Sequence, residues 1–202
     1  MSATRGINDP KRRPHDFYRT PEWATRAILP VLEEHIRPRA ILEPGAGSGA
    51  IAWVIHLRWP KAEYVAIELN IEHQWSLRNL GVGLTIGDYL EQDDKLLVPP
   101  YDLVIMNPPY SGPKRQDLVM EFTKRALVHA GKKGVVAVLT RLNWLGSQKR
   151  AQWHRDHRPF VGILPKRPSF TGDGKTDAVE YCWLVYGIPD LRGQWRILEL
   201  PK

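Results

Sequence analysis

Strand-like and helix-like segments alternate through the middle of the chain, and this alternation restricts the fold more than any other feature. Short apolar runs are separated by longer stretches with helix-ending signals such as Pro60 and Gly131. Strands that alternate with helices predict an α/β fold, with a mostly parallel sheet covered by helices on both faces. We expect strands at residues 39–42, 64–67, 84–86, 102–106 and 135–139, and helices at 48–58, 70–79 and 116–130.

The N-terminal residues depart from this pattern. Residues 1–15 are polar and basic without periodicity, which predicts a flexible arm. A helix should begin at Thr20-Pro21-Glu22, because threonine can cap, proline suits the first turn and a carboxylate favours the positive end of a helix. This helix is expected to end near Ala27 or to continue past Pro30 with a kink.

The pattern also changes after residue 139. A basic segment at 147–157 is predicted to be helical, and two strands at 160–164 and 179–186 are predicted to form a hairpin. Their connection, residues 166–177, is rich in glycine, serine and threonine, as a hairpin connection should be. Since we find no internal repeat and no linker, we expect residues 16–202 to form a single domain.

The composition excludes several classes of protein. Cys182 is the only cysteine, so the chain has no intrachain disulfide and no thiolate zinc cluster. His154 and His157 lie close in sequence, but no further ligands complete a set, and we predict no metal site. No apolar run approaches the ~18 residues of a membrane helix, and the N-terminus lacks the apolar stretch of a signal peptide. We therefore expect a cytoplasmic protein.

The charge is distributed unevenly along the 202 residues, whose net charge is +7. Residues 32–100 hold six Lys or Arg against ten Asp or Glu, whereas residues 111–167 hold thirteen against three. An acidic half followed by a basic half suggests two different partners, with a polyanion at the second. Charge alone does not decide between a polyanionic partner and a basic surface that is simply exposed to solvent.

A glycine-rich segment, Glu43-Pro44-Gly45-Ala46-Gly47-Ser48-Gly49, follows the first predicted strand and opens a helix. Glycines there permit a tight turn and the close approach of a ligand to the backbone. The pattern by itself is weak evidence, since a plain glycine turn is a serious alternative. Glu43 would repel a pyrophosphate, so its carboxylate better suits a ligand with a cationic amino group.

Two further acidic residues stand at the ends of the next two strands. Glu68 follows the second strand, about 20 residues after the glycines, where nucleotide folds bind a ribose. Asp88 follows the third strand and can accept from an adenine amino group, while the ring of Tyr89 can lie on the base. Each acid alone is more often a solvated strand end. Three acids at the carboxyl ends of successive strands favour a ligand site.

The fourth predicted strand ends in Asn107-Pro108-Pro109-Tyr110. Two prolines stiffen the turn and hold the flanking Asn107 and Tyr110 in place. The asparagine oxygen and the Pro108 carbonyl can both accept from one planar NH₂ group, which favours a pyramidal nitrogen with a freed lone pair. Tyr110 offers a ring for a base to stack on. A surface turn could explain the Asn-Pro pair alone. It does not explain all four residues at the end of this strand.

With these residues in place, the chain resembles the amino-methyltransferases, and the order of its motifs is similar to their gamma-type arrangement. Residues 18–23, YRTPEW, resemble the N-terminal cofactor motif of that group. Residues 141–145, RLNWL, and 169–174, SFTGDG, resemble segments of small DNA adenine methyltransferases carried by phages and prophages. The resemblance covers roughly residues 16–186.

The resemblance implies a Rossmann-like class I fold with a seven-stranded sheet, an antiparallel strand in its last hairpin, and S-adenosylmethionine as the cofactor. It also implies transfer of a methyl group to the N6 amine of an adenine flipped out of duplex DNA, with Asn107 to Tyr110 receiving the base. The large target-recognition domain of the family is missing, so we expect low or short sequence specificity. The residues predicted to contact the cofactor are Tyr18, Thr20, Pro21, Glu43, Gly45, Gly47, Glu68, Leu69, Asp88 and Tyr89.

The basic segment after the fifth strand is the predicted DNA-binding element. It should start beside the active-site edge of the sheet and contact phosphates. The residues predicted to bind DNA are Arg141, Asn143, Trp144, Lys149, Arg150 and Arg155.

Other functions remain open at this stage. A protein glutamine methyltransferase would use the same Asn-Pro-Pro-Tyr chemistry on an amide nitrogen, although only about 40 residues precede the glycine segment here. An RNA adenine methyltransferase shares the base chemistry. Methylation of cytosine N4 is a further alternative, but that group more often has serine at the position of Asn107. A nucleic-acid-binding protein with a relic cofactor fold fits the intact motifs least well.

Overall fold

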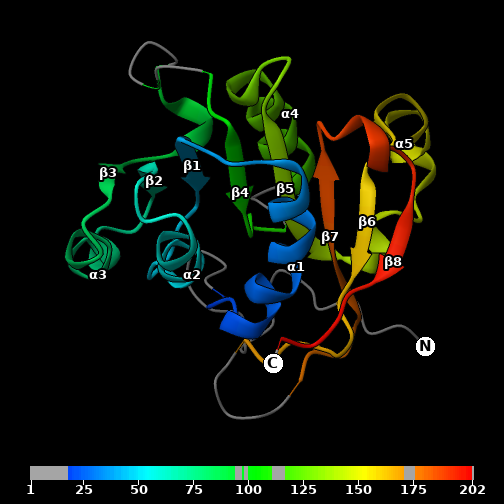
Figure 1. Ribbon diagram of the computed structural model, residues 1–202, viewed down its shortest axis with the longest axis horizontal. Coiled ribbons are helices and arrows are strands. Elements are labelled where there is room, and N and C mark those ends of the chain that lie inside the picture. Colours follow the sequence, from blue (N-terminus) through cyan, green and yellow to red (C-terminus); the bar gives the residue numbers. More distant parts are fainter. Residues whose placement is uncertain (1–17, 94–96, 98–99, 111–116, 171–175, 202) are drawn as a thin grey trace.

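The computed structural model describes residues 18–93, 97, 100–110, 117–170 and 176–201. Eight strands form one sheet in the order β3-β2-β1-β4-β5-β7-β6-β8 (Figure 1). The expected arm at residues 1–15 lies outside the described residues.

The first five strands are all parallel. Their chain order reverses between the neighbours β1 and β4, because β2 and β3 lie on one side and β5 on the other. Open sheets bind ligands at such a reversal, outside the carboxyl ends of the strands. The predicted strands are confirmed to within a few residues as β1 (Ala40–Pro44), β2 (Glu63–Glu68), β3 (Gly83–Ile86), β4 (Leu103–Met106) and β5 (Val135–Arg141).

The C-terminal part closes the sheet with an antiparallel hairpin, as expected. β7 (Tyr181–Tyr186) pairs antiparallel with β5, and β6 (Phe160–Ile163) pairs antiparallel with β7. A short edge strand, β8 (Trp195–Ile197), runs parallel to β6. The sheet therefore has eight strands rather than the expected seven.

Helices cover both faces of the sheet. Except for Ala40 and Arg141 at the strand ends, all residues of β1, β4 and β5 are buried, and successive side chains point to opposite faces. In β5, Val135 and Ala137 pack with one helical layer, whereas Val136 and Val138 pack with the other. The first layer holds α1 (Glu22–His35), α2 (Ala50–Arg58) and α3 (Gln74–Asn79), and the second holds α4 (Leu118–Ala130). α1 continues past Pro30. None of the described helices is long and apolar enough to cross a membrane.

The strand register shows at which end of the sheet each segment of the C-terminal region lies. Phe160 pairs with Val185, at the amino end of β5, so α5 (Ala151–His157), which precedes β6, lies at that end of the sheet (Figure 1). Ile163 pairs with Cys182, which pairs with Thr140 at the carboxyl end of β5. The connection from β6 to β7 therefore leaves the sheet at the carboxyl ends of the parallel strands.

The remaining elements of the described residues are short 3₁₀ turns at η2 (Ile71–His73), η3 (Tyr89–Glu91), η5 (Leu142–Trp144), η6 (Gln148–Arg150) and η7 (Pro189–Leu191).

Candidate active site

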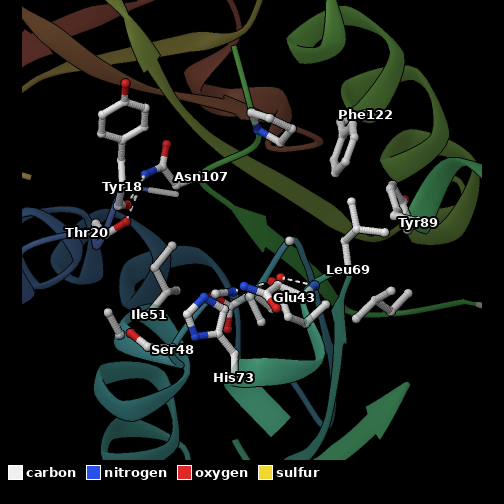
Figure 2. Close-up of a pocket in the computed structure, with 18 of the residues that line it drawn as sticks. Tyr18, Thr20, Glu43, Ser48, Ile51, Leu69, His73, Tyr89, Asn107 and Phe122 are labelled. Carbon is white, nitrogen blue, oxygen red and sulfur yellow. Dashed lines mark hydrogen bonds between the residues drawn. The ribbon is translucent and has the colours of Figure 1, made fainter. Parts of the chain in front are cut away.

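A pocket opens at the carboxyl ends of β1, β2, β3 and β4, where the order of the strands reverses (Figure 2). Of the predicted cofactor residues, all but Pro21 line it; Pro21 instead precedes α1. Asn107 and Pro109 reach the same pocket, whereas Pro108 and Tyr110 are not part of its lining. The sequence analysis missed several lining residues, namely Arg19, Ala46, Ser48, Ala50, Ile51, Ile67, Asn70, His73, Gly87, Leu90, Leu118 and Phe122.

The glycine segment forms the floor of the pocket between β1 and α2. Gly45, Gly47 and Gly49 have φ values of 68°, 54° and 83°, in the left-handed region that favours glycine. At Gly49 a Cβ atom would lie 2.6 Å from the Cδ1 atom of Leu80. The backbone conformation therefore favours glycine at residue 49, and a larger residue would also have to displace the side chain of Leu80.

Glu68 anchors this loop as well as lining the pocket. One carboxylate oxygen accepts from the backbone N–H of Gly47 at 2.6 Å, and the other accepts from the N–H of Asn70 at 2.8 Å. The side chain is only 7% exposed. Each carboxylate oxygen has a second lone pair, so the same group can also accept from a ligand hydroxyl. The predicted ligand residue thus has a structural role that its position in the sequence did not reveal.

Glu43 is a buried acid beneath the pocket. Its Oε2 accepts from the hydroxyl of Tyr64 at 2.5 Å. Burial, and then the nearby charge of Glu68, raise the pKa of Glu43 to about 8, although the hydrogen bond from Tyr64 acts in the opposite direction. Without a cationic partner, this carboxyl group is therefore mostly protonated at neutral pH.

The opposite wall of the pocket combines an acid with apolar side chains. Asp88 Oδ1 caps η3 by accepting from the N–H of Leu90 at 2.9 Å. Tyr89 is almost fully buried, because its hydroxyl bonds His129 at 2.9 Å and its ring packs at 5.1 Å from that of Phe122. Tyr89 therefore contributes to the wall, beside Phe122 (Figure 2), rather than presenting an open face to a base. Phe122 was missed because on α4 it resembles an ordinary core residue.

Asn107 lies on the other side of the pocket with a fixed orientation. Its Nδ2 donates to the hydroxyl of Thr20 at 3.0 Å and to the backbone carbonyl of Tyr18 at 3.4 Å (Figure 2). Because the amide nitrogen is used by these two acceptors, the Oδ1 atom points away from them. The structure thus brings the N-terminal motif and the Asn-Pro-Pro-Tyr turn together and leaves an oxygen as the hydrogen-bonding group of Asn107.

Tyr110 adjoins this oxygen. Its hydroxyl donates to Asn107 Oδ1 at 2.7 Å. The guanidinium carbon of Arg141 lies over the ring, 5.1 Å from its centre, and the ring of Tyr181 is 6.0 Å away. The predicted stacking of a base on Tyr110 must therefore use the part of the ring that these neighbours do not cover, or displace one of them.

A comparison with known protein families shows which family this chain belongs to. Residues 18–147, from the first wall of the pocket to the segment after β5, match the Methyltransferase small domain. The chain belongs to this family. A curated relative, the release factor glutamine methyltransferase of Rhodopirellula baltica, is 27% identical over an alignment of 179 residues that covers 80% of this chain. The match covers 56% of that relative, so the chain spans about half of its length.

Solved structures confirm the class I methyltransferase fold. A protein assigned as a class I S-adenosylmethionine-dependent methyltransferase from Listeria monocytogenes matches with a TM-score of 0.70 and 17% identity, over 93% of this chain and 68% of that one. A protein assigned as an RNA methyltransferase from Pyrococcus horikoshii matches with a TM-score of 0.67 and 22% identity, over 88% and 90%. The chain therefore has the fold of the class I methyltransferases, whose cofactor is S-adenosylmethionine.

The pocket residues suit this cofactor. Acids from three strand ends offer acceptors for its amino and hydroxyl groups, and apolar side chains can enclose its base. The hydroxyl of Ser48, on the pocket wall, is buried and has no hydrogen-bond partner among the described residues. A buried polar atom without a partner is costly, and a ligand in the pocket would satisfy it.

Cofactor binding by this methyltransferase should depend on pH through Glu43. The cationic amino group of the cofactor favours the ionised carboxylate, so binding should release the proton that the raised pKa of about 8 retains. Affinity is therefore expected to rise between about pH 6 and about pH 7.5. Calorimetry in buffers of different ionisation enthalpy measures both the affinity and the released proton.

The variant Glu43→Gln is the control, because its side-chain amide does not titrate. The amino group of the cofactor still titrates near pH 8 in both proteins. The difference between the two proteins isolates the contribution of Glu43. The same pH profile in both would contradict this role of Glu43.

Two of the residues predicted to bind DNA in the basic segment after β5 make contacts inside the protein. Trp144 is buried, and its indole N–H donates to Asp117 Oδ1 at 3.0 Å. Arg150 donates to Asp117 Oδ2 at 2.7 Å and to the Trp144 carbonyl at 2.7 Å, with its guanidinium over the indole ring. Placing Trp144 at a DNA surface was therefore wrong, and Arg150 serves internal contacts.

The rest of this segment leads away from the pocket. Arg155 is exposed, but it lies on α5, at the amino end of the parallel strands. Lys149 is also exposed, on the η6 turn that leads into α5. Asn143 is exposed in the turn that follows Arg141. Trp144 and Arg150 bond Asp117, which precedes α4 and the pocket residue Leu118, so they also lie at the active-site edge of the sheet. The predicted segment thus leaves this edge only along α5.

Arg150→Ala is expected to lower the free energy of unfolding by about 1–3 kcal/mol, because it leaves Asp117 without its ion pair and the Trp144 carbonyl without a donor. Lys149→Ala, one residue earlier and exposed, should change it by less than about 0.5 kcal/mol. Urea unfolding followed by tryptophan fluorescence compares the two. Equal stabilities would mean that Arg150 is free to serve a surface role.

Proposed function

We propose that this methyltransferase transfers the methyl group to the exocyclic N6 amine of adenine in DNA, with low or short sequence specificity. The orientation of Asn107 carries the proposal. Thr20 and Tyr18 hold its amide nitrogen, so its oxygen is the atom available to accept from a planar amine. An acceptor fixed in this way suits an NH₂ group and not a hydroxyl that must first lose its proton to a base.

The proposed mechanism requires little from the protein beyond placement. The bound cofactor supplies an electrophilic methyl group on a sulfonium. Asn107 Oδ1 and the Pro108 carbonyl accept from the two N–H groups of the target, which directs its lone pair toward that methyl group. Transfer of this methyl group to the nitrogen would leave the cofactor as a neutral thioether, and the proton lost from the nitrogen would pass to solvent water. Positioning and electrostatics supply the catalysis, without a covalent enzyme intermediate.

Two features favour a nucleobase over other planar amines. Residues 111–167 hold thirteen Lys or Arg against three Asp or Glu, as expected for a polyanionic partner. The ring of Tyr110, hydrogen-bonded to Asn107, gives a base a surface to stack on. The likeness of RLNWL and SFTGDG to segments of DNA adenine methyltransferases favours DNA over RNA.

A glutamine side chain of a protein is the second candidate, and the curated relative is the observation that favours it. That relative is a release factor glutamine methyltransferase, and its identity to this chain is 27% over 179 residues. A glutamine amide also presents a planar NH₂ group, so the same asparagine geometry can serve it. The two candidates differ in what surrounds the amine: a ring in a polyanion, or an aliphatic side chain in a peptide.

One experiment separates these substrates. The protein is incubated with methyl-labelled cofactor and, in separate reactions, with duplex DNA, RNA or a release factor with accessible glutamine side chains. Digestion followed by mass spectrometry identifies the labelled product. We expect N6-methyl-2′-deoxyadenosine from DNA at the highest rate, at sites of very few base pairs. N5-methylglutamine or methylated RNA as the main product would overturn the proposal and identify the alternative.

A further inference from the structure

Four side chains form a connected cluster where the β6–β7 connection meets the target side of the pocket. Arg141, the last residue of β5, pairs in the sheet with Tyr181, the first residue of β7. Arg141 Nε donates to the Tyr181 hydroxyl at 3.2 Å, and that hydroxyl donates to Asp177 Oδ2 at 2.8 Å. Arg141 also lies 3.8 Å from Asp177 and over the ring of Tyr110.

The cluster has a definite hydrogen-bond direction. Burial raises the pKa of Tyr181, so its hydroxyl stays neutral and can accept from Arg141 while donating to Asp177. The Asp177 side chain is only 13% exposed, which limits screening of its charge. The nitrogen atoms of Arg141 thus contact Tyr181 and Asp177, and the planar face of its guanidinium group contacts the ring of Tyr110.

This arrangement continues to the proposed acceptor of the target amine. Tyr110 donates to Asn107 Oδ1, and Thr20 and Tyr18 fix the other end of the same amide. Tyr110 follows two prolines and a short turn, so its ring orientation depends on what packs against it. Arg141 is a charged group on that ring, and a cation over an aromatic face is attracted to it.

We propose that Arg141 is a positioning residue: anchored by Asp177 and Tyr181, it sets the ring of Tyr110 and, through the Tyr110 hydroxyl, the orientation of Asn107 Oδ1. This inference rests on the proposed function, because it assumes a planar amine as the acceptor. It also changes the role of Arg141 from contacting DNA phosphates to organising the target site. The β6–β7 connection, through Asp177, then contributes to catalytic geometry without touching the reacting atoms.

The test compares Arg141→Gln and Asp177→Asn with Arg78→Gln, a matched change at an exposed arginine of α3 outside the pocket lining. Arg141→Gln should lower the single-turnover rate at saturating substrate by about tenfold to 10²-fold, as expected for a misplaced acceptor. The KM for the target and the cofactor Kd should change little. Asp177→Asn retains an oxygen for Tyr181 but loses the charge, so its effect should be smaller and of the same kind. Arg78→Gln should match the wild type.

A second measurement needs no substrate. In protein labelled with ¹³C-tyrosine, the ring signals of Tyr110, assigned with Tyr110→Phe, should shift or broaden in Arg141→Gln and not in Arg78→Gln. Unchanged Tyr110 signals, or a raised KM and smaller salt dependence at an unchanged saturating rate, would overturn the inference and return Arg141 to phosphate binding. A wild-type protein inactive on every planar amine would refute the proposed function instead, and the Tyr110 signals would still report whether Arg141 positions the ring.

Discussion

Asn107→Ala is expected to lower methyl transfer by about 10²–10³-fold while cofactor binding persists, the scale seen when one preorganised polar group of an active site is removed. The reason is its orientation: Thr20 and Tyr18 engage the amide nitrogen, and Oδ1, which accepts from Tyr110, keeps a second lone pair for the target. Single-turnover kinetics at saturating substrate give the rate, and calorimetry gives the cofactor Kd.

Asn143→Ala serves as the matched control, because Asn143 is an exposed asparagine outside the pocket lining. It should retain the wild-type saturating rate. An Asn107→Ala protein with near-normal turnover would refute the assignment of Asn107. A protein that loses cofactor binding to the same extent as activity would instead make Asn107 a cofactor residue.

Glu68→Ala is expected to have the largest effect on cofactor affinity. The variant loses the hydrogen bonds that hold Gly47 and Asn70, and it loses the acceptor proposed for the ribose. Hydrogen bonds to a charged group contribute about 1.5–3 kcal/mol each, so the loss of one ligand contact together with loop order should raise the cofactor Kd by about 10²-fold or more.

Glu63→Ala is the control, since Glu63 is exposed at the opposite end of the same strand. Its cofactor Kd should equal that of the wild type. DNA affinity measured without cofactor should be unchanged in both variants. A cofactor Kd that is unaffected in Glu68→Ala would contradict the strand-end interpretation of this acid.

The parallel half of the sheet was predictable because its strands are continuous apolar runs bounded by glycine, proline and acidic residues. β8 was not, since Trp195, Arg196 and Ile197 are all exposed and show no alternation between a core and a solvent face. Its strand conformation comes from pairing with β6. A strand defined mainly by its neighbour leaves little signal in its own residues.

The cofactor half of the pocket was also largely predictable, because the carboxyl ends of parallel strands must meet at one edge of the sheet. The role of the basic segment was not. Arg150 and Trp144 have the composition of a nucleic-acid surface, but their partner Asp117 lies about 30 residues earlier in the chain, at the start of α4. Only the folded structure shows that one carboxylate draws both side chains inward.

The place where the β6–β7 connection leaves the sheet has a consequence for how such an enzyme can change. It extends from an antiparallel hairpin beside the target side of the pocket, whereas the cofactor is served by loops of the parallel strands. Insertions after Leu164 could therefore alter which substrates are admitted without shifting the register of β1 to β5. Residues such as Asp177 and Tyr181 would constrain only the final part of an insertion. Homologues should then differ most in length at this connection, and grafting it between them should transfer substrate preference while cofactor affinity stays with the recipient.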